Sequence, residues 1–281
     1  MLFNLKVFTI VALTLSWIGQ LAFGVAYEGF DYPNDSAPLE DKSGGFGWDG
    51  PWTLSERELP GVFTHSQDDT SLSHSGYPFT PVGDRVLAIG PADGLANNNK
   101  IDRALAAGFD MGTDGSLYVS YLFQKNGSDS TAGDNQEVDF LGTPLRMGST
   151  SGDEFWLGRS GANNSQPQDP AITFGDTYYI VARIQAVAAG DDLFSMMVFD
   201  ETESVPTTEP GTWDADYVVG DIADVVTGLR FWIGTNASGA YDELRVGSNW
   251  TGVAVPVPEP TSWAIFLIFG LGLGMQRRAR R

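Results

Sequence analysis

The chain contains no cysteine among its 281 residues. This absence excludes thiolate catalysis, cysteine-ligated metal sites and a disulfide framework, so an exported form of the protein depends on its hydrophobic core for stability. Histidine is almost as scarce, with two residues. The sequence also has no phosphate-binding loop and no dinucleotide-binding fingerprint. These absences exclude the commoner thiol- and nucleotide-dependent activities.

Basic residues are few, at 16 against 36 acidic residues. All the acidic residues lie between positions 27 and 260, whereas five of the basic residues lie in the two ends, so this central part carries a net charge of −25. Such a field repels nucleic acid and anionic lipid and favours solubility. We therefore expect no nucleic-acid partner.

Helix signals are weak between residues 27 and 260. Glycine supplies 34 residues and aromatic residues 12% of the chain, and turn-forming residues separate short β-branched and aromatic runs. This pattern is typical of an all-β sandwich. In Leu117–Gln124, side chains alternate so that Leu117, Val119, Tyr121 and Phe123 share one face. The other expected strands are Val86–Ile89, Val138–Leu141, Glu154–Leu157, Thr177–Gln185, Leu193–Phe199, Leu229–Ile233 and Asp242–Val246, with Ile101–Ala107 as strand or loop.

The N-terminus resembles a secretory signal peptide, at residues 1–26. Lys6 supplies a positive n-region, Val7–Ile18 is an apolar h-region, and small residues precede a cleavage site between Ala26 and Tyr27. The alternative, an uncleaved membrane helix, is disfavoured because the apolar stretch is short. We expect the Sec export machinery and signal peptidase as partners.

The C-terminus combines three signals. A Val257-Pro258-Glu259-Pro260 motif precedes an apolar run of 13 residues, 263–275, and then a basic cluster. As a helix this run rises only about 20 Å, against about 30 Å for a bilayer core, so it is a poor permanent anchor. Residues 251–260 are interpreted as a linker to the tail. The predicted domain bounds are 27–252 for the sandwich and 253–281 for the linker with the tail. The basic cluster is Arg277, Arg278, Arg280 and Arg281.

This tail resembles the PEP-CTERM sorting signal of Gram-negative bacteria. The resemblance covers roughly the last 25 residues. It implies processing near the Pro-Glu-Pro motif by an exosortase-type transpeptidase, after transient membrane insertion of the C-terminal helix. It also implies an inner-membrane intermediate, followed by release or attachment at the cell surface.

The body resembles concanavalin A-like (laminin-G-like) jelly-roll domains. The matching segments are Tyr27–Pro33, Gly44–Trp52, Phe174–Val181 and Tyr241–Trp250. The resemblance implies a two-sheet antiparallel jelly-roll sandwich whose first and last strands pair. Lectins, glycan hydrolases and structural modules share this fold, so the fold does not determine function.

Two carboxylate pairs are candidates for glycoside hydrolysis. Glu137 and Asp139 fall on one strand face, but position 142, where a third carboxylate would complete the hydrolase pattern, is glycine. Asp242 and Glu243 are adjacent and are expected on opposite faces, as part of an end-of-domain structural signature. We therefore expect no catalytic residue and no enzyme activity.

Metal and cofactor sites are weakly indicated. His65 and His74, with Asp68 and Asp69 nearby, are interpreted as solvated loop residues rather than a metal pair. Calcium prefers oxygen ligands, so a structural calcium site is the stronger candidate. The sequence predicts no cofactor and leaves the metal unknown. The candidate calcium ligands are Asp191 with Asp192, Asp214 with Asp216, and Asp110 with Asp114.

Six tryptophans are candidates for stacking on a sugar, although a sandwich core also uses tryptophan. Trp213, with Asp214 and Asp216, is the candidate ligand-binding group because it lies in a Pro- and Asp-rich loop. Extracellular polysaccharide is a candidate partner. The predicted function is an exported, non-catalytic surface or matrix protein; the alternatives are a carbohydrate-binding lectin-like module and, less favoured, a glycoside hydrolase. The remaining tryptophans are Trp48, Trp52, Trp156, Trp232 and Trp250.

Overall fold

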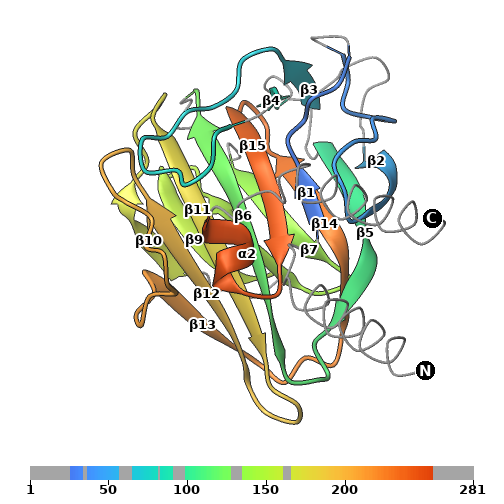
Figure 1. Ribbon diagram of the computed structural model, residues 1–281, viewed down its shortest axis with the longest axis vertical. Helices are drawn as coiled ribbons and strands as arrows, with labels where there is room; N and C mark the ends of the chain where they lie inside the picture. Colours follow the sequence, from blue (N-terminus) through green and yellow to red (C-terminus); the bar gives the residue numbers. More distant parts are fainter. Residues whose placement is uncertain are drawn as a thin grey trace, which may run out of the picture.

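The computed structural model describes residues 26–33, 37–56, 65–81, 83–90, 99–127, 135–160 and 166–255. Nearly all of this part is β-structure in two sheets, and the pairings between its strands are antiparallel (Figure 1). The prediction of an all-β, two-sheet antiparallel sandwich is confirmed. Most of the signal peptide, residues 257–260, the C-terminal helix and the arginine cluster lie outside the described residues. Within them, no helix has the length and hydropathy that a membrane span requires.

The first sheet has eight strands, and its order explains how the two ends of the domain meet. Strand β1 pairs with β15, placing Ala26 beside Val246, so the first and last strands pair as the resemblance implied. The order is β13 (Ala215–Gly220), β12 (Asp192–Phe199), β11 (Thr177–Ala186), β6 (Gly115–Lys125), β15 (Ser238–Gly247), β4 (Arg85–Ile89) and β3 (His65–Asp68), with β1 (Ala26–Glu28) added on β15.

The second sheet has seven strands. The segment expected as strand or loop, residues 101–107, is part of the long strand β5, which pairs with β14 and β2. The order is β10 (Gln166–Ala171), β9 (Glu154–Arg159), β8 (Leu145–Ser149), β7 (Gln136–Leu141), β14 (Val225–Ile233), β5 (Asn99–Asp110) and β2 (Trp48–Glu56).

The main core lies between the inner faces of the two sheets. Alternation in β6 turns Val119, Tyr121 and Phe123 inward, as predicted. Across the sheets, Phe231 of β14 stacks on Tyr241 of β15, with ring centroids 4.4 Å apart. Burial of such aromatic side chains is the main favourable contribution to folding, and it replaces the disulfides that the chain lacks.

A second apolar cluster covers the outer face of the eight-stranded sheet. Tyr118 and Leu122 of β6 point into it, and loops 69–81 and 200–214 and the short helix α2 (Trp250–Ala254) lie over it (Figure 1). Helix α2 begins at the cap Asn249, whose side chain accepts a hydrogen bond from Gly252 N. The interpretation of residues 251–255 as linker is therefore wrong, because Val253 and Ala254 are buried against the sheet.

Candidate functional site

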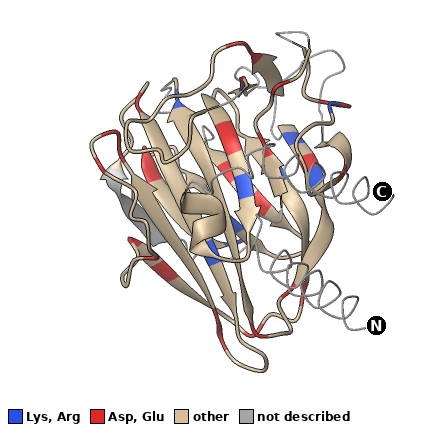
Figure 2. Cartoon of the chain, viewed as in Figure 1, with Lys and Arg blue, Asp and Glu red and all other residues tan. Residues whose placement is uncertain are grey.

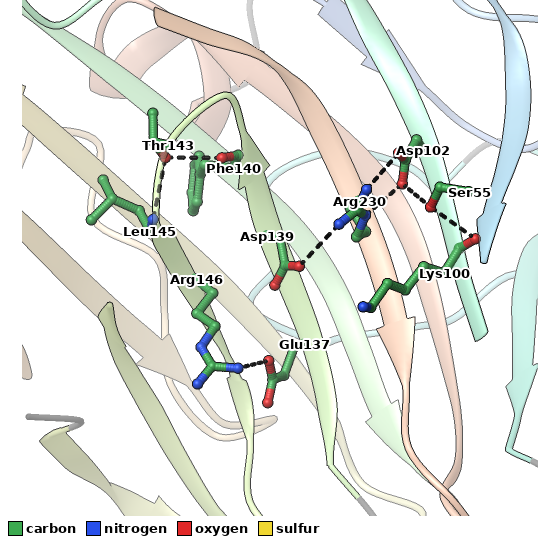
Figure 3. A network of polar contacts seen from close by, with 10 residues as sticks. All are labelled: Ser55, Lys100, Asp102, Glu137, Asp139, Phe140, Thr143, Leu145, Arg146 and Arg230. Carbon is green, nitrogen blue, oxygen red and sulfur yellow. Dashed lines mark hydrogen bonds and ion pairs between the residues drawn. The ribbon is translucent and has the colours of Figure 1, made fainter. Parts of the chain in front are cut away.

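The outer face of the seven-stranded sheet carries a group of charged side chains that we call the charged face (Figure 3). In β7, Val138 and Phe140 pack in the core, so Glu137 and Asp139 share the opposite side, as the sequence predicted. Residues paired with them on β8 and β14, and those that follow on β5, face the same way. The charged face consists of Lys100, Asp102, Glu137, Asp139, Arg146 and Arg230.

Strand register aligns four of these residues in a row of alternating charge. Arg146 of β8 is opposite Asp139 of β7, which is opposite Arg230 of β14, which is opposite Asp102 of β5. Opposite charges on directly paired residues stabilise a sheet. The row, which we call the ion ladder, fixes the arginine side chains on an otherwise acidic body.

The strongest contact of the ion ladder is a fork between Arg230 and Asp102. Arg230 Nε donates to Asp102 Oδ1 at 2.7 Å and its Nη2 donates to Oδ2 at 2.8 Å. Ser55 Oγ donates to the same Asp102 Oδ1 at 2.8 Å. Bidentate geometry of this kind is strong and directional, so the guanidinium of Arg230 has a fixed orientation.

Asp139 is held more loosely than its neighbours. Arg230 Nη1 is 4.0 Å from Asp139 Oδ2. Asp139 Oδ1 is buried and has no hydrogen-bond partner among the described residues. Burial raises the pKa of Asp139, while Arg230, Arg146 and Lys100 oppose that rise. A buried acceptor without a donor is costly.

Glu137 is buried beside the ion ladder. Its side chain is 1% exposed, and its Oε2 accepts a hydrogen bond from Arg146 Nη1 at 3.0 Å. The guanidinium of Arg146 also lies 4.9 Å from the ring centroid of Trp156. Burial raises the pKa of Glu137 to about 8, although Arg146 acts in the opposite direction.

A pocket of about 300 Å³ opens at one end of the ion ladder. Asp139, Arg146 and Arg230 line it, together with the β7–β8 turn around Thr143 and with Ser160. Glu137 is not among the lining residues, so the two carboxylates of the sequence pair differ in access. The pocket thus offers one carboxylate and two guanidinium groups to a small polar ligand.

Two tryptophans flank the other side of the ion ladder. Trp232 of β14 is opposite Glu137 and is half-buried, and Trp156 of β9 is buried with its Nε1 unpartnered among the described residues. Gly148 lies between Glu137 and Trp156, and a Cβ there would meet Gln136 O at 2.0 Å. Only glycine therefore allows these strands to pair so closely.

The ligand-binding group predicted from sequence lies elsewhere, beside β12 and β13. Trp213 is half-buried, packing edge-on against Trp250 with centroids 5.9 Å apart and lying 4.7 Å from the Arg183 guanidinium. Asp214 Oδ2 accepts a hydrogen bond from Val198 N, and Asp216 Oδ1 accepts one from Ser195 Oγ. These carboxylates join a loop and an edge strand to β12, and the group's role in ligand binding stays a prediction.

Asp242 and Glu243 do not point to opposite faces as expected. Glu243 has a φ of 53° and the register shifts between Asp242 and Arg245, so a bulge adds one residue to β15. Both carboxylates then bind loop 69–81 on the outer side. Asp242 Oδ2 accepts hydrogen bonds from Ser71 Oγ and Leu72 N, and Glu243 Oε2 accepts one from Tyr77 Oη. Their role in the fold is to attach this loop to the sheet.

The histidines are not solvated loop residues. His65 lies in β3 and His74 in loop 69–81, and both are buried. Burial lowers the pKa of His65 to about 3. His74 Nδ1 accepts a hydrogen bond from Gly76 N, and its Nε2 lies 3.1 Å from Phe199 O. Each histidine is thus part of the packing.

The carboxylates proposed for calcium have hydrogen-bonding roles of their own. Asp192 is buried and accepts from Val187 N and Ile222 N, while Asp110 and Asp114 accept from backbone N–H groups of turns. No group of three or more metal-ligating side chains occurs in the described ranges.

Sequence reasoning found two of the six residues of the charged face. It paired Glu137 with Asp139 but missed Lys100, Asp102, Arg146 and Arg230. Arg230 and Asp102 are 128 residues apart in the sequence, and only the order of the strands brings them together. Strand alternation could have identified part of the missing group, because Lys100 and Asp102 are two residues apart and therefore share one side of the strand 99–110.

No protein-family model matches the chain, and no curated protein sequence matches it. Solved structures with a similar arrangement include an endo-β-1,4-glucuronan lyase from Trichoderma reesei, with 10% identity, a TM-score of 0.44 and coverage of 81% of this chain and 96% of that one. The metal-free carbohydrate recognition domain of Emp46p has 7% identity, a TM-score of 0.40 and coverage of 66% and 88%. Domain 4 of AbnA, an extracellular arabinanase from Geobacillus stearothermophilus, in complex with arabinotriose, has 16% identity, a TM-score of 0.40 and coverage of 81% and 93%. These neighbours are lyase, lectin-like and carbohydrate-binding sandwiches, and at such identities the likeness does not extend to a ligand.

Proposed function

We propose that this protein is an exported, non-catalytic surface or matrix module that binds extracellular polysaccharide through the pocket at the ion ladder. One observation carries the proposal: the partly exposed side chains of Asp139, Arg146 and Arg230 line one pocket, with exposures of 24%, 27% and 25%. Sugar-binding sites combine a few fixed polar groups of this kind with aromatic surface, which Trp232 supplies nearby.

Binding without catalysis follows from the unequal access of the two carboxylates. Glycoside hydrolysis uses two carboxyl groups that both reach the scissile bond. Asp139 lines the pocket, whereas Glu137 is buried, bonded to Arg146 and absent from the lining. A sugar in the pocket therefore meets one reachable carboxylate and no acid partner.

Delivery depends on the two ends of the chain. The signal peptide directs export, and the tail from Val257 to Arg281 directs exosortase-type processing. Mass spectrometry of the exported protein tests this part, with an N-terminus at Tyr27 and a missing arginine cluster as the expected result. An intact C-terminus in the exported product would contradict the processing proposal and leave the binding proposal untouched.

A glycan array probed with the purified protein tests the binding function. We expect retention on at least one extracellular polysaccharide, with no release of reducing ends when that polysaccharide is incubated with the protein. Failure to bind any glycan would leave a purely structural surface module, and chain cleavage would make the protein an enzyme.

A further inference from the structure

The two residues that follow strand β6 are Asn126 and Gly127, the only Asn-Gly step in the sequence. In such a step the backbone nitrogen of the glycine can attack the side-chain amide of the asparagine, because glycine has no Cβ to obstruct the approach. Neither residue lines the pocket at the ion ladder, so the chemistry of this step is independent of the proposed function.

Hydrogen bonds hold the chain up to the backbone nitrogen of Asn126. Lys125 O accepts from Gly175 N at 2.8 Å, and Asn126 N donates to Ser238 O at 2.8 Å. Beyond that atom, neither the side-chain amide of Asn126 nor the backbone N of Gly127 has a hydrogen-bond partner among the described residues. Asn126 is also exposed. The two reacting groups therefore lack contacts that would have to break before they meet.

The usual structural reason for an Asn-Gly step does not apply here. Type I′ hairpin turns select this pair because they need a positive φ at both positions. Neither Asn126 nor Gly127 has a positive φ. A Cβ added at Gly127 would meet only Ser238 Cβ among the described atoms, at the ordinary contact distance of 3.5 Å. The described fold thus accepts an alanine at this position.

The other described asparagines lack this combination of exposure, freedom and a following glycine. Asn99 is buried in β5, and Asn135 Nδ2 donates to Glu137 Oε1. Asn249 is the cap of helix α2, and its Oδ1 accepts two hydrogen bonds from the first turn of that helix. Asn236 is followed by alanine, whose Cβ obstructs the attacking nitrogen.

We propose that Asn126 is a site of spontaneous deamidation. The backbone N of Gly127 attacks Asn126 Cγ and loses its proton, and the side-chain nitrogen takes up that proton and leaves as ammonia. The product is a five-membered succinimide ring that joins the two residues. Water then opens the ring at either carbonyl, which yields aspartate or isoaspartate at position 126. The only co-reactant is water, and nothing is oxidised or reduced.

The conversion adds a negative charge and leaves the sheet intact. The nitrogen of Asn126 that bonds to Ser238 O is not a member of the succinimide ring, so the last hydrogen bond of the anchored segment survives. Isoaspartate lengthens the main chain by one carbon, but only after β6 has ended at Lys125. The product is a more acidic form of a body that already carries acidic residues on strands and loops (Figure 2).

Peptide mapping of the full-length protein after incubation at mildly alkaline pH tests the proposal. Mass spectrometry with electron-transfer fragmentation distinguishes aspartate from isoaspartate, and hydroxylamine cuts the chain where the succinimide has formed. We expect conversion at Asn126 to exceed that at Asn236 and Asn249, with hydroxylamine cleavage between Asn126 and Gly127. Conversion should be slower at mildly acidic pH, because the attacking amide must lose its proton.

Three variants separate the chemistry from the fold. Gly127→Ala is the matched control, since a Cβ fits there; it should lose most of the conversion and keep the wild-type Tm. Asn126→Gln lengthens the side chain, disfavours closure of a five-membered ring and should lose the conversion as well. Asn126→Asp reproduces one product and should unfold at the wild-type temperature, which checks that deamidation leaves the fold intact.

A denatured sample provides the reference for an open site. We expect the folded protein to convert Asn126 at a rate comparable to that in urea, because no contact of the fold holds the reacting groups. Conversion in urea but not in the folded protein would overturn the proposal. Unchanged conversion in Gly127→Ala, or equal conversion at Asn236, would overturn it too.

Discussion

At the scale of single residues, the motif at the start of the body forms a buried clamp between the sheets. Glu28 of β1 and Arg103 of β5 form an ion pair in which both side chains are 1% exposed. Tyr32 Oη donates to Glu28 Oε2 at 2.8 Å, and Arg103 Nη2 donates to Gly44 O at 2.8 Å. The guanidinium lies 5.4 Å from the ring centroid of Trp48. The aromatic and acidic residues of this motif thus have a packing role.

Removing one partner of this clamp should be severely destabilising. Arg103→Met leaves Glu28 buried without its cation, and the loss expected for such a change is about 3–5 kcal/mol. Urea denaturation followed by fluorescence measures the effect. The double variant Glu28→Gln with Arg103→Met removes both charges and should recover part of the stability. A single variant that loses less than about 1 kcal/mol would show that the pair is unimportant.

The free energy of unfolding should also depend on pH through two buried carboxyl groups. Burial raises the pKa of Glu137 to about 8 and that of Asp242 to about 7, above the values of an unfolded chain. A raised folded pKa means that the folded state binds the proton more tightly, so its stabilising effect is present in acid and is lost as the pH rises through the folded pKa. Stability should therefore increase from pH 9 to pH 5, by up to about 1.4 kcal/mol per pH unit for each group.

Urea midpoints between pH 5 and pH 9 measure this dependence. Glu137→Gln mimics the protonated acid, so the variant should be more stable than the wild type at pH 9, and its stability should fall less steeply between pH 5 and pH 8. Wild-type stability that is flat or rises toward pH 9 would contradict the assignment of raised pKa values.

At the scale of elements, the sequence predicted most strands whose own segment contains a pattern, although it missed the alternating strand β13. Alternation identified β6 and β11, and apolar runs identified β12 and the second half of β14. Sequence reasoning failed where pairing with neighbouring strands, rather than the pattern of the segment itself, determines the structure. The strand β8, Leu145–Ser149, contains an arginine and a glycine, and only its position between β7 and β9 makes it regular. The prediction that Asp242 and Glu243 lie on opposite faces failed because alternation assumes an unbroken strand, whereas the bulge at Glu243 interrupts β15.

Helix α2 provides the sharpest test of the second apolar cluster. Trp250 is 3% exposed, its Nε1 donates to Pro206 O at 2.9 Å, and its ring packs against Trp213. Trp250→Ala removes this packing and should cost about 3–5 kcal/mol. Thr251→Ala changes an exposed side chain of the same helix and should cost about 0.5 kcal/mol or less. Thermal unfolding compares them, and equal stabilities would show that the packing of Trp250 does not stabilise the fold.

At the scale of the whole molecule, strand order assembles the charged face. Strands β7 to β10 are neighbours both in the chain and in the seven-stranded sheet, whereas β14, from a distant part of the chain, is inserted between β7 and β5. From the sequence, Glu137 and Asp139 were correctly placed on one side, but the arginines that control their access were not found. Strand alternation identifies which residues share a side, whereas pairing between distant segments depends on the packing of the complete core.

The net charge of the body leads to a prediction about salt. With 36 acidic residues crowded between positions 27 and 260, self-repulsion opposes the compact state. Screening lengths fall from about 30 Å at 0.01 M salt to about 8 Å at 0.15 M, so added NaCl weakens long-range repulsion while the partly buried ion ladder is screened less. Raising NaCl from about 10 mM to about 300 mM should therefore raise the Tm by a few degrees. A Tm that falls with salt would show that surface ion pairs outweigh the repulsion. CaCl₂ at equal ionic strength is the matched control, because an additional rise beyond that with NaCl would reveal specific calcium binding rather than screening.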